Sequence, residues 1–467
     1  MKLFDVLVAF AGLSLLLLAG ITLRRKLRWL RQLGIPEALV AGLLGLLIGP
    51  FGPIRLFPEQ VYTVWAQTPG VLISLVFATL FLGQRLPSPR QLWQRAAGQT
   101  AFGMTLGCGQ YLVGALLVWL VLQPLFGTNP LMACLIEVGF EGGHGTAAGM
   151  GDTFADLGLP SGEALGLAMA TVGVVSAVLI GSTLVVIGRG RSWLSAPDKQ
   201  PAAGPLLQRA AHSDPMSAEA KLAQEEAAGL SDPIGSASVT IDALTVNLAL
   251  AGAAVGLGVL LKDGITRLGG ALGGAATADL LNAIPVFPLA MLGGLMVQLL
   301  LQWRRHSNLA SPVVQASVGS LAMDVLITAA MASLNLPMLE DNWLPFLLLA
   351  LAGLAWNVAA FLLLARRFFR DHWFERAIAD FGQGTGVTAT GLLLLRMADP
   401  LGRSRAMESF SFKQLVFEPF LGGGLITALA PIALASWGLP RFNAVAFLLT
   451  VASIAFGLWI GRRPQRA

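Results

Sequence analysis

The sequence predicts an all-helical membrane protein that crosses the bilayer many times. Of its 467 residues, 55% are hydrophobic and only 12% are charged, whereas soluble proteins carry about 25% charged residues. The hydrophobic residues are also grouped into long blocks, and a bilayer-spanning helix needs roughly 20 mostly apolar residues. A chain of this composition cannot cover itself with polar groups, so we expect it to lie in a membrane.

Eleven apolar blocks follow one another along the chain. The first one is longer than the apolar part of a secretory signal, and its basic cluster Arg24–Lys26 comes after the apolar stretch, which favours an uncleaved helix. Cys108 and Cys134 both lie in apolar segments, which argues against a disulfide framework. The blocks are 3–23, 35–50, 71–83, 102–122, 165–187, 241–261, 286–301, 313–334, 343–364, 412–437 and 442–460.

The distribution of Lys and Arg predicts the orientation. Cytoplasmic loops of membrane proteins carry an excess of these residues, so Arg24–Arg31 is placed inside and the N-terminus outside. This topology requires that segments 130–156 and 374–397 each enter and leave on one side. It places 26 of the 31 Lys and Arg inside, and the net charge of +5 then requires no nucleic-acid partner. The five outside are Lys2, Arg55, Lys262, Arg267 and Arg441.

The chain divides into two membrane halves, 1–187 and 241–436, joined by a polar segment. Residues 188–240 are rich in Ala, Ser, Pro, Asp and Glu, and we interpret them as a cytoplasmic linker in which 218–228 could form a surface helix. Each half reads as five spanning helices plus one same-side segment. Because five is odd, the second half is inverted relative to the first, as in many secondary transporters. Residues 437–467 add a C-terminal helix.

The two same-side segments share a glycine-rich pattern. Glu141-Gly-Gly-His-Gly-Thr146 in the first matches Asp380-Phe-Gly-Gln-Gly-Thr385 in the second, at a shift of 239 residues. Glycine adopts backbone angles closed to other residues, and half-helices that end inside a membrane present N–H groups to anions and C=O groups to cations. The pattern predicts two re-entrant hairpins, over 130–156 and 374–397, whose breaks meet at mid-membrane. The alternative is that these glycines only permit close helix packing.

The motifs resemble those of the sodium:glutamate symporter family. Gly142-Gly-His-Gly-Thr146 is similar to the first re-entrant motif of that family, and Gly382-x-Gly-x-Gly386-x-Thr388-x-Thr390 to the second. Ile35-Pro36-Glu37 resembles the start of its second helix. The resemblance covers about 1–435, without the linker, and implies sodium-coupled uptake of an acidic amino acid by a homodimer in the bacterial cytoplasmic (inner) membrane, each protomer holding two inverted repeats.

Three residues depart from the family pattern. Glu141 stands where the family has a small hydroxyl residue, Ala147 where it has Gly, and Ala389 where it has Pro. Glu141 and His144 could contact the amine or carboxylate of the substrate, relay a proton, or hydrogen-bond within the hairpin. A Glu-x-x-His pair also fits a metal, but no second His or Cys cluster completes such a site, so we expect no metal other than sodium and no cofactor.

The remaining candidates are polar residues inside apolar segments. Asp324 lies in the middle of block 313–334, where a carboxylate is costly unless it is paired or functional. Threonine hydroxyls suit sodium, which prefers hard oxygen ligands, although threonine in helices commonly bonds its own backbone. The candidate coupling-ion residues are Asp324, Asp380, Thr388 and Thr390. The candidate substrate-binding residues are Glu141, Gly143, His144, Gly145, Thr146, Asn357, Gln383, Gly384, Thr385 and Gly386.

Three other functions compete with glutamate symport. A carrier or exporter of another small organic anion, such as a di- or tricarboxylate, with sodium or proton coupling, would have the same architecture. An intramembrane enzyme is disfavoured because the sequence has no His-Glu-x-x-His zinc motif, no Gly-x-Ser-x-Gly nucleophile elbow and no nucleotide-binding loop. A channel would not need two opposed hairpins. We therefore expect a secondary transporter rather than an enzyme.

Overall fold

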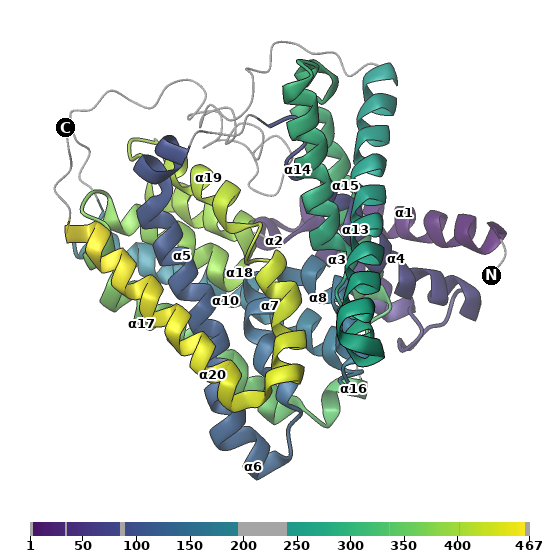
Figure 1. Cartoon of the computed structure of the whole chain (residues 1–467), viewed down its shortest axis with the longest axis horizontal. Coiled ribbons are helices and arrows are strands. Elements are labelled where there is room, and N and C mark those ends of the chain that lie inside the picture. Colours follow the sequence, from purple (N-terminus) through teal and green to yellow (C-terminus); the bar gives the residue numbers. More distant parts are fainter. Residues whose placement is uncertain are drawn as a thin grey trace. The chain divides into compact units, whose positions relative to one another are not determined.

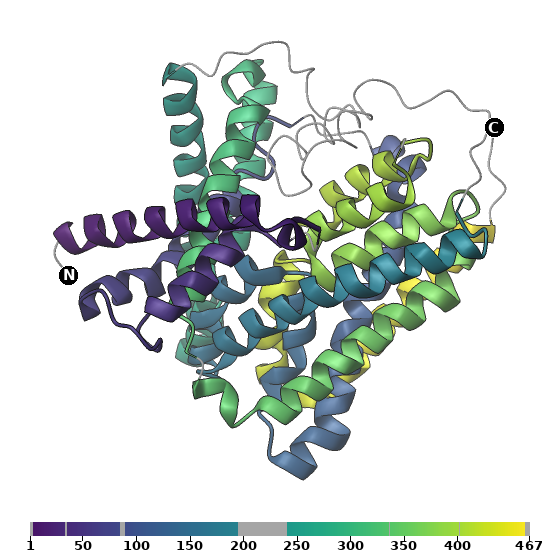
Figure 2. The same cartoon turned by 180° about the vertical axis from the view of Figure 1, so that it is seen from behind.

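The protein is all-helical over the residues that its computed structural model describes, which are 3–32, 35–84, 89–194, 241–335, 337–400 and 402–462 (Figures 1 and 2). Within these residues, nine helices are long and apolar enough to cross a membrane. This confirms the predicted polytopic all-α fold class. The spans are 3–26, 59–78, 95–126, 162–190, 243–275, 286–303, 312–332, 343–368 and 425–462.

The predicted blocks differ from these spans in two places. Block 35–50 corresponds to a shorter apolar helix, Glu37–Ile48. Block 412–437 is wrong as a single helix, because the left-handed backbone angles of Gly422 (φ 71°) and Gly423 (φ 103°) interrupt it. The following helix continues to Arg462 and is broken at Gly438 (φ 71°), which separates the last two apolar blocks.

The described residues pack into two compact units, and each unit takes segments from both halves of the sequence. The first unit consists of Met1–Gln84, His144–Ala168 and Ile234–Trp343, and the second of Arg85–Gly143, Met169–Pro233 and Leu344–Ala467. The predicted division into 1–187 and 241–436 concerns sequence repeats, so the compact units do not test it. Most of the predicted linker, from residue 195 to 240, lies outside the described residues, as does its proposed helix at 218–228.

The first unit is held together by small residues that let its helices approach closely. A Cβ atom on Gly20 would lie 2.8 Å from Ala41, and one on Gly42 would lie 2.4 Å from the Cβ of Met331. Trp65 also donates a buried hydrogen bond of 3.0 Å to the carbonyl of Ala9. The helices are α1 (Leu3–Lys26), α2 (Arg28–Gln32), α3 (Glu37–Ile48), α4 (Glu59–Ala78), α9 (Gly151–Asp156), α13 (Ile241–Asn282, broken at Gly274), α14 (Val286–Trp303), η3 (Ser307–Leu309), α15 (Pro312–Ala332) and α16 (Pro337–Glu340).

The second unit has an aromatic core. Phe361 packs edge-to-face against Phe374 and Phe381, at centroid distances of 5.5 and 5.8 Å, a geometry that aromatic rings prefer. α5 runs along α20 in both views of the fold (Figures 1 and 2). The helices are α5 (Pro89–Leu117), η1 (Val118–Leu122), α6 (Gln123–Phe126), η2 (Pro130–Cys134), α7 (Leu135–Phe140), α17 (Trp343–Phe368), α18 (Trp373–Ala398), α19 (Ala406–Phe417) and α20 (Leu425–Arg462). α8 (Gly143–Gly149) and α10 (Gly162–Gly190) each continue from one unit into the other.

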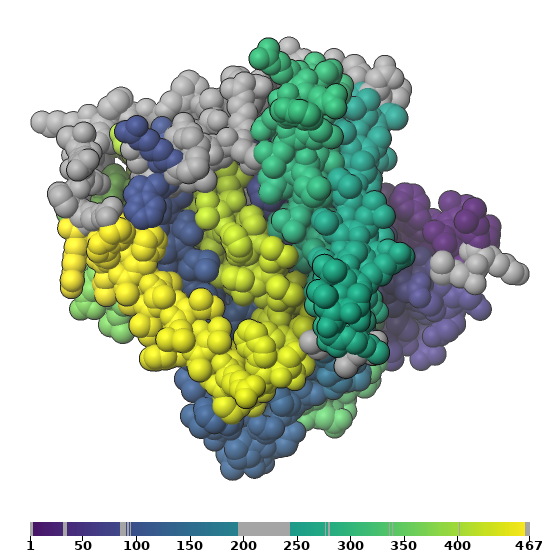
Figure 3. Space-filling view, viewed as in Figure 1, coloured from purple at the N-terminus to yellow at the C-terminus, as the bar shows by residue number. Residues whose placement is uncertain are grey.

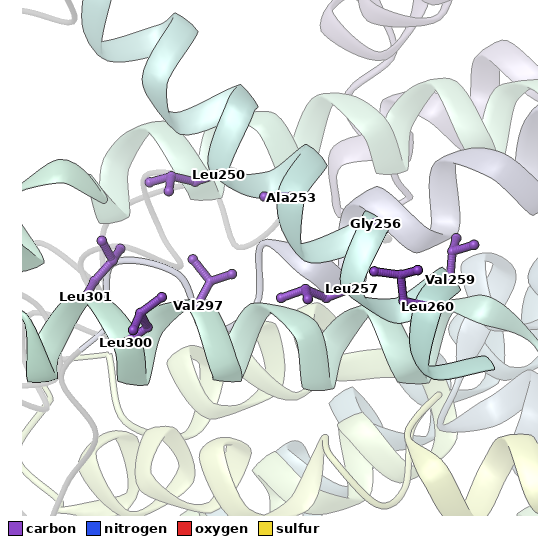
Figure 4. A pocket seen from close by; sticks show the side chains of 9 residues that line it. All are labelled: Leu250, Ala253, Gly256, Leu257, Val259, Leu260, Val297, Leu300 and Leu301. Atoms are coloured by element: carbon purple, nitrogen blue, oxygen red, sulfur yellow. The ribbon is translucent and has the colours of Figure 1, made fainter. Parts of the chain in front are cut away.

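Apolar side chains are exposed on the long helices, as expected for surfaces that face lipid. α20 (yellow in Figure 3) exposes Phe447, Leu448 and Trp459. α13 exposes Leu260 and Leu272. The groove between α13 and α14 is lined only by glycine and apolar side chains, such as Leu257 and Leu300 (Figure 4). It offers no group that would bind a carboxylate or a cation, so we do not place the functional site there.

Candidate functional site

α18 is a helical hairpin rather than a straight helix. Its backbone leaves the helical region at Gly386 (φ −155°, ψ 43°) and Val387 (φ 66°, ψ 168°). A Cβ atom on Gly382 would lie 2.6 Å from the Cα of Gly391, although nine residues of continuous helix would separate them by about 13.5 Å. The chain therefore turns back on itself at Gly386 and Val387. That both arms enter the membrane from the cytoplasm stays a prediction.

The glycine-rich pattern contains the second break but does not align it with the first. The shift of 239 pairs Gly143 with Gly382, but only Gly143 has left-handed angles (φ 72°), while Gly382 lies within the first arm of α18. Gly382 instead provides the space in which the two arms touch. The two glycines that the pattern pairs therefore have different roles. Gly143 is needed for its left-handed backbone angles, and Gly382 is needed because a side chain there would collide with the second arm.

The two breaks lie against each other. In the first segment, α7 ends at Phe140, Glu141 and Gly142 form a turn, and α8 begins at Gly143. A Cβ atom on Gly143 would lie 2.3 Å from a methyl carbon of Val387. The structure therefore brings the candidate residue Gly143 into contact with Val387, which follows the candidate residue Gly386 in the other half of the sequence. The first segment passes into the other unit after Gly143, and His144, Gly145 and Thr146 belong to that unit.

Two buried amides hold the end of the first arm of α18. Asn357 on α17 donates a hydrogen bond of 2.7 Å to the carbonyl of Gly384 and one of 3.0 Å to the hydroxyl of Thr385. Gln110 on α5 also donates to the carbonyl of Gly384. Carbonyls at the end of a helix lack partners inside it, and the break creates such an end. Asn357 and Gln110 therefore stabilise the hairpin, and the side chain of Gln110 is one that the sequence reasoning missed.

A buried ion pair lies beside the first arm. Lys413 on α19 is 3.2 Å from a carboxylate oxygen of Asp380, and both side chains are fully buried. Lys413 also donates a hydrogen bond of 2.7 Å to the side chain of Gln383, and Gln99 donates one of 2.8 Å to the carboxylate of Asp380. The ammonium lies 3.8 Å from the centroid of the Phe417 ring, a cation–π contact. Asp380 and Gln383, which are both candidates from the sequence, thus interact with the same lysine.

The count of Lys and Arg placed Lys413 among the cytoplasmic residues, and it did not predict that this side chain is fully buried. The signal available in the sequence was the aromatic neighbourhood of this lysine, because Phe410, Phe412 and Phe417 lie within four residues of it. Gly103 on α5 explains how the lysine fits. A Cβ atom at Gly103 would lie 2.5 Å from Cε of Lys413 and 2.8 Å from its ammonium nitrogen.

Two glutamates of the first segment have different surroundings. Glu137 accepts hydrogen bonds from Tyr111, from the backbone N–H of Gly422 at 3.0 Å and from Thr427 at 2.7 Å. Glu141 is also buried, but neither of its carboxylate oxygens has a hydrogen-bond partner among the described residues. Glu137 is therefore satisfied by its own unit, while Glu141 is a buried carboxylate without a donor.

The second arm of α18 begins with hydroxyl side chains. Thr388 is half-buried, and its hydroxyl accepts a hydrogen bond of 2.9 Å from the side-chain amide of Gln414. Thr390 is buried. The break leaves the first N–H groups of this arm without intrahelical partners. The start of the arm therefore presents N–H groups and hydroxyls close to Gly386.

The first unit holds the other candidates. His144 and Thr146 are buried in α8. A Cβ atom on Gly145 would lie 2.9 Å from the sulfur of Met323 on α15, the residue next to Asp324. Asp324 itself is exposed on α15 within this unit. None of the described residues forms a group of three or more His, Cys, Asp or Glu side chains that could hold a metal.

Comparison with known families agrees with the resemblance seen in the sequence. Residues 3–191 match the family model described as sodium/glutamate symporter. No curated protein matches the chain. The matched range includes α1 to α10 and the whole first glycine-rich segment. Over residues 3–191 the chain is thus related to the sodium/glutamate symporters, which are membrane transporters that use Na⁺ and not enzymes.

Proposed function

We propose that this protein is a secondary transporter that takes up glutamate or a related acidic amino acid together with Na⁺ by alternating access. The observation that carries the proposal is the meeting of the two breaks at Gly143 and Val387. Interrupted helices that meet inside a membrane are the usual site of substrate binding in inverted-repeat transporters. The inverted repeats 1–187 and 241–436, the bacterial inner membrane and the homodimer are part of this proposal, on the strength of the family resemblance.

The second arm of α18 suits a carboxylate of the substrate. Its N-terminal N–H groups carry the positive end of the helix dipole, and the Thr388 hydroxyl lies at the same place. The amide-capped carbonyl of Gly384 and the hydroxyl of Thr385 belong to the facing end of the first arm. The break can therefore bind an anionic group on one side while keeping its own backbone satisfied on the other.

Uptake into proteoliposomes tests this function. We expect labelled glutamate or aspartate to accumulate only with an inward Na⁺ gradient, and unlabelled substrate to compete saturably. A panel with di- and tricarboxylates separates the alternative carrier, because citrate or succinate would then be taken up in preference. Equal uptake with and without Na⁺, for every compound in the panel, would exclude the proposal.

Asp324→Asn should weaken activation by sodium. The carboxylate is exposed in the middle of a membrane-spanning helix, where a charged group is retained chiefly for function. If it holds the coupling ion, loss of its charge should raise the half-saturating Na⁺ concentration by about tenfold or more, equivalent to about 1.4 kcal/mol. Initial uptake rates at graded Na⁺ measure this.

Asp263→Asn is the matched control, because Asp263 is an exposed carboxylate in a surface pair with Arg267. It should leave the sodium dependence unchanged. A normal sodium dependence in Asp324→Asn, at normal protein levels, would assign Asp324 a structural role.

A further inference from the structure

Among the described residues, the interior of the second unit holds more carboxyl groups than ammonium groups. Three carboxyl groups are buried close to the two breaks, those of Glu137, Glu141 and Asp380, and Glu375 is buried farther away, at the start of α18. One ammonium, that of Lys413, is buried with them. Charges taken out of water are costly unless they are paired and hydrogen-bonded. The way each carboxylate is compensated therefore shows which one still needs a cation.

Two of the three carboxylates are compensated by the protein. Asp380 has its ion pair with Lys413 and a hydrogen bond from Gln99. Glu137 accepts from Tyr111, Gly422 and Thr427. Lys413 thus acts as a fixed cation for Asp380, which removes Asp380 from the candidate sites of a mobile ion.

Glu141 is the one left over. Its side chain is 4% exposed, and neither oxygen has a hydrogen-bond partner among the described residues. The Glu141 carboxylate fits against α5 only because residue 107 is a glycine, since a Cβ atom on Gly107 would lie 2.5 Å from one carboxylate oxygen. Gly107 lies one helical turn from Gly103, which makes room for Lys413 in the same way. Glu141 therefore lies next to the ion pair but outside its hydrogen bonds.

Groups on every neighbouring element act on Glu141. They are the Cys108 thiol on α5, Glu137 on α7, Asp380 on α18 and the Lys413 ammonium on α19. Lys413 attracts Glu141 from a distance, but its ion pair is with Asp380 and its hydrogen bond is with Gln383, so among the described residues it makes no hydrogen bond to the Glu141 carboxylate. Glu141 also follows α7 directly, at the turn that leads to Gly143 and the meeting point of the two breaks.

We propose that Glu141 binds one monovalent cation of its own, a proton or Na⁺, in every transport cycle, while Lys413 permanently replaces a second one at Asp380. The cation reaches the carboxylate from the solution on one side and is released to the other side. This inference deepens the proposed function and rests on it.

Limiting accumulation ratios of glutamate test the proposal. Wild type and Glu141→Gln are reconstituted at zero membrane potential, and tenfold gradients of Na⁺ and of protons are imposed one at a time. Each coupled cation multiplies the limiting ratio by about tenfold under such a gradient. In Glu141→Gln we expect the ratio to fall about tenfold with one of the two gradients. A fall with the proton gradient identifies a proton, and a fall with the sodium gradient identifies Na⁺.

Glu408→Gln is the matched control, because it also removes one carboxylate from the second unit, but one that pairs with Arg95 near the surface. It should keep both ratios. Wild-type ratios in Glu141→Gln would overturn the inference and leave the proposed function standing. A wild type that does not accumulate glutamate would instead overturn the proposed function.

If Glu141→Gln does not transport glutamate, its cation binding is measured instead through the stability of the folded protein. The melting temperature of the purified protein is measured against Na⁺ at fixed pH and against pH at fixed Na⁺, since a cation that binds only the folded state stabilises it. We expect one of the two stability dependences to be weaker in the variant than in the wild type, because one bound cation is lost. Stability dependences on Na⁺ and on pH that are both as large as in the wild type would overturn the inference.

Discussion

Replacing Lys413 with methionine should lower the free energy of unfolding by about 3–5 kcal/mol, because removal of one partner leaves the other charge buried and uncompensated. Asp380 would keep only its hydrogen bond from Gln99, and Gln383 would lose its 2.7 Å donor. Methionine fills a similar volume, so the loss comes from charge rather than from a cavity. Melting temperature in detergent and the amount of folded protein in the membrane measure the effect.

Combining Lys413→Met with Asp380→Asn separates charge from shape. The double variant removes both charges, and replacement of a whole buried pair by neutral groups is often nearly neutral. We expect the coupling between the two sites to restore about 2 kcal/mol relative to the single lysine variant. Lys26→Met, at an exposed lysine of α1, is the control and should not change the melting temperature. Unchanged stability in Lys413→Met would mean that Asp380 is neutral without it.

The sequence was sufficient for the fold class because composition alone forces it. A chain with only 12% charged residues has to place its apolar blocks in lipid or in its own interior. Helices suit a lipid environment because they satisfy their own backbone hydrogen bonds. The glycine-rich segments were also recognisable, since Gly143 needs left-handed angles. The grouping into compact units could not be read from the sequence, because each unit joins three separate stretches of chain.

The ion pair was missed for a different reason. Lys413 and Asp380 are far apart in sequence and lie on different helices, and the space for the lysine comes from Gly103 on a third one. A pattern along one helix contains none of these relations. The unusual backbone of Val387 was missed for a similar reason, because a β-branched residue at φ 66° is disfavoured locally and is held there only by the packing of the whole hairpin.

Gly382→Val should disrupt the α18 hairpin and abolish transport. Its Cβ atom would lie 2.6 Å from the Cα of Gly391 and 2.9 Å from the carbonyl of Thr390. These are backbone atoms that cannot rotate away, so the two arms would have to separate. Overpacking in protein interiors costs about 1–3 kcal/mol and occasionally more, and here we expect about 3 kcal/mol or more, measured as a lower melting temperature together with loss of uptake.

Two further variants show whether the close contact of the arms is the cause. Gly391→Ala approaches the same contact from the other arm, since its Cβ would lie 2.4 Å from the carbonyl of Ala379, and it should have the same effect. Gly252→Val is the control, because a Cβ atom at Gly252 in α13 meets nothing within 4 Å, and it should leave melting and uptake unchanged. If Gly382→Val and Gly391→Ala behaved like Gly252→Val, the arms would not be packed against each other, and Gly386 and Val387 could not be the turn that brings the second break to Gly143.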